Sequence, residues 1–216
     1  MRSARLLASA CAAVLLFGSA PALAQVGTPA LDRALAPIPA PRDAPYPGVI
    51  TLEMDATDLD RRIISVKQSI PVVAPGPLTL LYPEWIPGNH GPVGPVDDIA
   101  DLRITANGQT LPWVRNTVHT SGFQVEVPAG ATSVEVSFKW LTPIDGSQGR
   151  VVITDEMLNI QWEKALLYPA GYYSSQITFR PTLRLPAGWR YGTALDTESF
   201  EDGVASFAPI TLEHFA

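Results

Sequence analysis

The residues with the clearest chemical potential are three histidines, His90, His119 and His214. None of them begins an H-E-x-x-H motif. A zinc site needs three or four ligands that converge on one point, usually partly from a short local motif. Histidines on three separate segments could still converge in space, but the simpler interpretation places them on loops or at the surface.

Two groups of acidic residues could do general acid–base work or bind calcium. They are Asp97, Asp98 and Asp101, and the adjacent Asp155 and Glu156. Solvated turns and helix N-termini carry the same pattern, and we favour that interpretation. The sequence contains no G-x-S-x-G elbow, phosphate-binding glycine loop or dinucleotide fingerprint. We therefore expect no catalytic residue in this chain.

Two segments combine aromatic residues with proline and glycine, as binding loops often do. Residues 82–92 read YPEWIPGNHGP, and residues 167–173 read LYPAGYY. The first predicts a stiff loop that forms one wall of a ligand cleft. The alternatives are a sandwich corner in which Trp85 fills the core, and a sheet edge closed by the second segment's tyrosines. The candidate cleft residues are Trp85, Asn89, His90 and Tyr168.

Strands rather than helices must position these segments. The chain has 216 residues, of which 21 are proline and 16 glycine, and proline breaks helices. Apolar residues alternate with polar ones in many short windows, which predicts about nine or ten strands. These windows lie near residues 50–55, 64–70, 78–82, 102–106, 111–113, 123–127, 134–140, 158–162 and 177–185. Asn107-Gly108 is the strongest hairpin signal. The pattern predicts an all-β fold, an antiparallel β-sandwich with one solvated face per sheet.

The first residues are typical of a secretory signal peptide at 1–24. Arg2 and Arg5 precede an apolar run, and an A-x-A cleavage site ends at Ala24. The run is short for a bilayer span, so an uncleaved anchor is the less favoured alternative. Cleavage would remove Cys11, the only cysteine, and leave no membrane span. We expect a secreted or periplasmic protein.

Beyond the signal peptide we expect two segments. Residues 25–47 carry six prolines and predict an extended leader or linker. Residues 48–216 then form the β-sandwich. The formal net charge of −6 and the lack of a basic stripe argue against nucleic acid as a partner.

Several segments, in order from about Gly48 onward, resemble one known domain. The Trp-Ile-Pro-Gly loop beginning at Trp85 resembles a loop in the N-terminal domain of the glycyl aminopeptidase family of gluzincin metallopeptidases (metallopeptidase family 61). Many members have a tyrosine where this chain has His90. The other similar segments span residues 102–113, 125–138, 158–162, 167–171 and 185–195.

The resemblance implies a β-rich domain that precedes a zinc-dependent catalytic domain carrying H-E-x-x-H. The chain stops at about the point where family members continue into that domain. We therefore expect a fragment: a non-catalytic N-terminal domain, inactive alone, that packs on the catalytic domain and helps to wall its peptide-binding cleft. It would hold no cofactor itself, whereas its parent would use zinc. The alternative is a free-standing exported β-sandwich that binds peptide or glycan.

Overall fold

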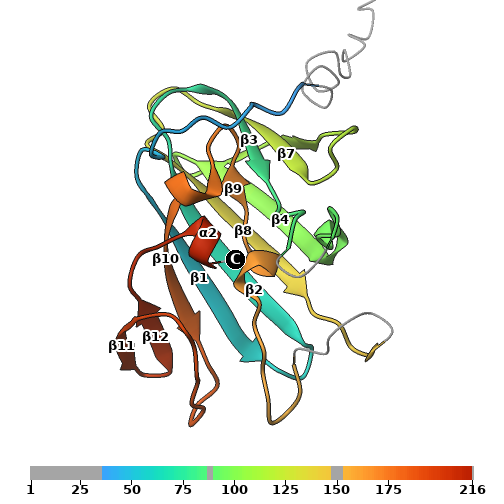
Figure 1. Ribbon diagram of the computed structural model, residues 1–216, viewed down its shortest axis with the longest axis vertical. Coiled ribbons are helices and arrows are strands. Elements are labelled where there is room, and N and C mark those ends of the chain that lie inside the picture. Colours follow the sequence, from blue (N-terminus) through green and yellow to red (C-terminus); the bar gives the residue numbers. More distant parts are fainter. Residues whose placement is uncertain (1–35, 87–89, 147–152, 216) are drawn as a thin grey trace, which may run out of the picture.

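Two β-sheets that share one hydrophobic core form the fold (Figure 1). The structure, a computed structural model, describes residues 36–86, 90–146 and 153–215. The large sheet has the strand order β11-β12-β10-β1-β2-β8-β4-β5, and β13 also pairs with β10. The small sheet has the order β6-β7-β3-β9. The predicted all-β sandwich is confirmed.

The described strands fall into two lists. In the large sheet they are β1 (Val49–Asp58), β2 (Ile63–Pro71), β4 (Ile99–Ala106), β5 (Gln109–Leu111), β8 (Ser133–Leu141), β10 (Thr178–Arg184), β11 (Thr197–Glu201), β12 (Val204–Phe207) and β13 (Ile210–Thr211). In the small sheet they are β3 (Gly76–Leu81), β6 (Trp113–Arg115), β7 (Gly122–Val127) and β9 (Tyr168–Pro169). Short helical turns are η1 (Val96–Asp98), η3 (Trp162–Ala165), η4 (Ser174–Gln176) and α2 (Leu212–Phe215).

One strand pair departs from the antiparallel pattern. Strand β1 runs parallel to β10, with Val49 opposite Thr178 and Asp55 opposite Arg184, whereas the other described strand pairs are antiparallel. Parallel neighbours need a long connection, and here that connection carries the whole small sheet. The pairing therefore joins the first strand of the domain to a strand near its C-terminal end.

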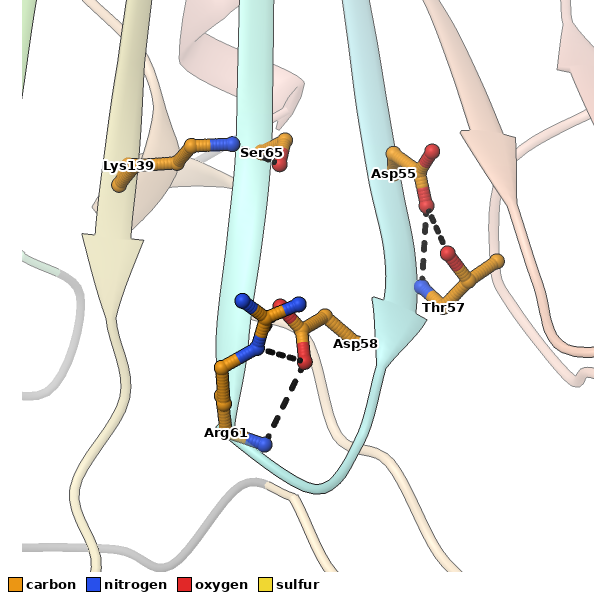
Figure 2. A network of polar contacts seen from close by, with 6 residues as sticks. All are labelled: Asp55, Thr57, Asp58, Arg61, Ser65 and Lys139. Carbon is orange, nitrogen blue, oxygen red and sulfur yellow. Dashed lines mark hydrogen bonds and ion pairs between the residues drawn. The ribbon is translucent and has the colours of Figure 1, made fainter.

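The alternating pattern creates one buried and one solvated face on the large sheet. In β1 the buried residues are Ile50, Leu52, Met54 and Ala56, and β2 and β8 alternate in the same way. The outer face is polar. The Lys139 ammonium donates to the Ser65 hydroxyl at 2.6 Å on this face. Figure 2 shows these two side chains on β8 and β2, together with the contacts Asp55–Thr57 and Asp58–Arg61 near the β1–β2 turn. This face therefore needs no covering layer.

Two turns have the backbone that tight hairpins require. Asn107 and Gly108 both have positive φ, 51° and 75°, and join β4 to β5. The hairpin predicted there is confirmed. Asp202 and Gly203, with φ of 50° and 77°, join β11 to β12 in the same way.

The strand predicted at residues 158–162 is wrong. Within this window, Leu158 makes an isolated bridge to Ile153, and Trp162 begins η3. The apolar residues of the window do pack against the core, but they belong to an irregular segment and not to a paired strand. We call residues 158–167, which cross the large sheet at Gln68, the crossing. The side chain of Gln68 fixes this crossing, because it accepts from the N–H and donates to the carbonyl of Leu167, each at 2.8 Å.

The leader docks on the sandwich in its described part, residues 36–47. The side-chain amides of Asn116 and Gln124 donate to the carbonyl of its first described residue, at 2.7 and 3.1 Å. The Arg42 guanidinium lies 4.2 Å from the centre of the Tyr172 ring. These contacts attach the described part of the leader, residues 36–47, to the fold. The signal peptide lies outside the described residues, so the boundaries at 24 and 47 stay predictions.

Candidate functional site

The segment after β3, residues 82–95, folds back on itself; we call it the aromatic loop. The N–H of Gly94 donates to the carbonyl of Glu84 at 3.0 Å, and Trp85 bridges to Pro92. A Cβ at Gly94 would lie 2.0 Å from the carbonyl oxygen of Pro83, so this close approach requires glycine. The two arms of the loop are therefore held together at their base.

Trp85 lies on the surface of this loop with 68% of its area exposed. The interpretation in which Trp85 fills the core is therefore wrong. His90 is also exposed, and Asn89 lies outside the described residues. An exposed indole on a closed loop offers a flat apolar surface for a ligand or a partner.

Tyr168 lies beside the base of the same loop. It belongs to β9 and stands opposite Leu81, the last residue of β3. Burial raises the pKa of the Tyr168 phenol, and the nearby Glu84 carboxylate raises that pKa further. The structure thus brings two of the candidate segments, which are 83 residues apart, to one corner of the molecule. Whether these residues bind substrate stays a prediction.

Two acids, the buried Glu163 and the half-buried Asp98, lie beside this corner, and sequence reasoning singled out only Asp98. The Tyr82 hydroxyl donates to the carbonyl of Lys164 at 3.1 Å. Burial raises the pKa of Tyr82, and the carboxylates of Asp98 and Glu163 raise it further. Tyr82, Asp98 and Glu163 therefore lie close together; with Trp85 and Tyr168 they form what we call the aromatic corner.

Glu163 is the least exposed acidic residue of the corner. It lies in η3 with 6% of its area exposed. Burial raises the pKa of its carboxyl, while its own backbone N–H and Lys164 lower it. No sequence motif marked Glu163, because a single acid inside an apolar window reads as a solvated strand residue. Its burial arises from the chain crossing at η3.

The pKa of Asp98 is raised in the same direction and, as for Glu163, chiefly by burial. Asp97 and Asp98 lie in the first turn of η1, as the helix N-terminus interpretation expects, but Asp98 is partly buried rather than solvated. Burial and the adjacent Asp97 raise the pKa of Asp98, while Trp140 and Lys164 lower it. The Trp140 indole N–H is fully buried and forms no hydrogen bond of standard geometry among the described residues. We therefore take its effect on Asp98 to be that of a nearby dipole.

The described residues do not fit a zinc site. Among residues 36–86, 90–146 and 153–215, no group of three or more His, Cys, Asp or Glu side chains could hold a metal ion. His90 lies on the aromatic loop and His119 lies between β6 and β7. His214 lies in α2, where its Nδ1 is 2.9 Å from the hydroxyl of Thr211 in β13. No helix in that part of the chain is long and apolar enough to cross a membrane.

Comparison with known proteins gives one family match. The family model described as Peptidase M61 N-terminal domain matches residues 51–216. This agrees with the resemblance carried by the aromatic loop and the segments after it. No curated protein matches the chain.

Several solved structures are similar to this chain. An aminopeptidase N family protein from Idiomarina loihiensis is 17% identical with a TM-score of 0.55; 73% of this chain and 27% of that chain are covered. An M1 zinc metallopeptidase from Deinococcus radiodurans is 14% identical with a TM-score of 0.37, covering 84% and 43%. Yeast LTA4 hydrolase in complex with bestatin is 13% identical with a TM-score of 0.42, covering 76% and 26%. The first shows a shared fold. The chain spans less than half the length of each.

Proposed function

Because this chain belongs to the Peptidase M61 N-terminal domain family, we propose that it is the non-catalytic N-terminal domain of an exported zinc aminopeptidase. The aromatic corner then forms one wall of the peptide-binding cleft of a catalytic domain. Zinc, held by that domain, would polarise the scissile carbonyl and activate water. We assign no step of this chemistry to the residues of this chain.

The observation that carries the proposal is the exposed indole of Trp85 on a loop closed by Gly94. The Trp85 side chain is 68% exposed and so adds little to the core of this domain. Because the loop that carries it is closed at its base, a bound peptide would have less loop motion to restrict, which lowers the entropic cost of binding. Such a surface suits contact with the apolar side chains of a peptide. The loop would therefore orient the substrate rather than react with it.

The test begins with the coding sequence past Ala216. We expect an H-E-x-x-H motif within about one domain length, roughly 100–200 residues. In that full-length protein, Trp85→Ala should raise KM for peptides several-fold with little change in kcat. Val118→Ala, at a residue equally exposed (72%) and remote from the corner in sequence, is the matched control. Absence of the motif, or equal kinetics for the two variants, would contradict the proposal.

Two further measurements address export and the alternative function. N-terminal sequencing of the exported protein should begin at Gln25, since the A-x-A site ends at Ala24. The purified chain alone should show no peptidase activity with added zinc. If it instead bound a peptide or glycan unaided and no catalytic domain followed, the free-standing binding module would replace our proposal.

A further inference from the structure

A groove lies where the chain that follows β10 meets the segment before η3. This first half has a volume of about 440 Å³, within the range of roughly 300–1,000 Å³ that is usual for ligand pockets. A second hollow of about 670 Å³ lies beside it and is lined in part by the β11–β12 hairpin, at the lower left of Figure 1. The two hollows share Leu185, Trp189 and Arg190. They therefore meet at Trp189, and we call the two halves together the Trp189 groove.

A tight turn presents Trp189 to the groove. The N–H of Trp189 donates to the carbonyl of Pro186 at 3.1 Å, and Gly188, the third residue of this turn, has a φ of 80°. Glycine adopts the positive φ that such a turn requires without strain. Trp189 is only partly buried, so part of its surface is available to a ligand.

Four aromatic rings form a fixed row along the groove. The Phe207 ring packs edge-on against the rings of Trp162 and Tyr191, with 5.8 Å between centroids in each pair. Tyr191 packs edge-on against Phe200 at 5.1 Å, and its hydroxyl donates to the Thr197 hydroxyl at 3.1 Å. Edge-to-face pairs stabilise each other beyond simple burial. A ligand would therefore meet rings that are already ordered, which lowers the entropic cost of binding.

Polar side chains surround these rings, and most of the lining of the first half is polar. Two carboxylates and two guanidinium groups line the groove, and their formal charges cancel: Glu156, Asp202, Arg184 and Arg190. The side-chain amide of Asn159, in the first half, can both donate and accept. The described lining therefore offers many hydrogen-bonding groups without an excess of either charge.

A neutral saccharide fits this combination. A sugar ring has an apolar C–H face that can lie on an aromatic ring, and hydroxyl groups that pair with carboxylate, amide and guanidinium groups. A lipid chain, or a peptide anchored by an apolar side chain, would bury the polar lining without partners, which costs free energy. A strongly charged ligand would meet equal numbers of like and opposite charges.

We propose that the Trp189 groove binds a neutral oligosaccharide. One sugar ring stacks on Trp189, and the polar side chains of the lining pair with the hydroxyl groups. An oligosaccharide suits the groove better than a single sugar because an extended ligand can occupy both halves. This site is separate from the proposed peptide-binding wall at Trp85, and it does not depend on the proposed function.

The test titrates the isotope-labelled chain with cellobiose, maltose, lactose and diacetylchitobiose, followed by two-dimensional NMR. The chain has five tryptophans, and each contributes one indole N–H signal. At least one of these sugars should shift the signals of Trp162 and Trp189 at millimolar concentration. The signals of Trp113 and Trp140, which pack in the core, should stay in place.

Three variants separate binding from folding. Trp189→Ala should weaken binding of the responding sugar about tenfold. Glu156→Lys changes an exposed residue of the rim, so it should weaken binding several-fold and leave Tm unchanged. Tyr173→Ala removes an aromatic side chain that is 49% exposed outside the groove, and it should leave Kd unchanged.

Four results would overturn the inference. None of the four sugars shifts the Trp162 and Trp189 signals at tens of millimolar; or trialanine shifts them and no sugar does, which assigns the groove to peptide. A third is an unchanged Kd for both Trp189→Ala and Glu156→Lys. The fourth is a dimer in sedimentation that Glu156→Lys dissociates, which assigns the groove to a second copy. Saccharide binding is compatible with a following H-E-x-x-H motif, so the proposed function is tested separately.

Discussion

Replacing Gln68 with leucine should destabilise the domain more than any exposed substitution on the same strand. Gln68 is 2% exposed, and its side-chain amide pairs with both the N–H and the carbonyl of Leu167, which is itself fully buried. Gln68→Leu leaves both backbone groups without a partner. Each such group costs about 1–3 kcal/mol, which gives roughly 2–6 kcal/mol for the two.

Part of that loss returns because leucine is apolar. Burying its side chain contributes roughly 1.5–3 kcal/mol, so we expect a net loss of about 0.5–3 kcal/mol. In a domain of this size 1 kcal/mol corresponds to roughly 2–4 °C, so Tm should fall by roughly 1–12 °C. Urea unfolding followed by tryptophan fluorescence measures the free energy directly.

Two variants sharpen this measurement. Lys67→Leu introduces the same residue on the solvated face of β2 and should stay within about 0.5 kcal/mol of wild type. Gln68→Glu keeps the acceptor for the Leu167 N–H but loses the donor, so the Leu167 amide should stay protected from exchange. A loss for Gln68→Leu no larger than that for Lys67→Leu would refute the reasoning.

Three other perturbations test the remaining structure. Burial raises the pKa of Glu163, so the free energy of unfolding should fall as pH rises from about 4 and the carboxyl ionises. Urea titrations should show that Glu163→Gln removes this fall and is more stable than wild type at pH 7. Gly94→Ala should cost about 1–3 kcal/mol by overpacking, whereas Gly91→Ala, with no atom closer than 4.0 Å to the added carbon, should cost much less. A chain that begins at residue 48 should be less stable by about 2–4 kcal/mol than one that begins at 25, because it loses several leader hydrogen bonds of about 0.5–1.5 kcal/mol each; equal Tm values would contradict the docked leader.

The sequence predicted the sheets well because their physics is local. Alternation in β1, β2 and β8 follows directly from burial on one face, and the turn at Asn107-Gly108 needs only two residues that tolerate positive φ. The Asp202-Gly203 turn carries the same signal, and it would have revealed the β11–β12 hairpin. That hairpin was missed because all five residues of β11 are exposed, so the strand shows no alternation.

The crossing at residues 158–167 could not be predicted, because its cause is tertiary. Its apolar residues have the spacing of a strand, but no neighbouring strand is free to pair with it along its length. The Gln68 side chain takes over the role of a strand partner for Leu167. Nothing in the residues around position 68 distinguishes such a clamp from an ordinary polar residue on a strand.

The candidate site was also predicted only where its signal is local in the sequence. The composition of the aromatic loop marked Trp85, and the structure shows it exposed. The burial of Glu163 depends on where η3 lies, and so the sequence did not reveal it. The segment from Trp162 to Tyr168 supplies an acid of the corner and reaches the edge strand of the small sheet. Because the buried Gln68 side chain holds this segment at Leu167, any movement of the crossing would displace the proposed cleft wall.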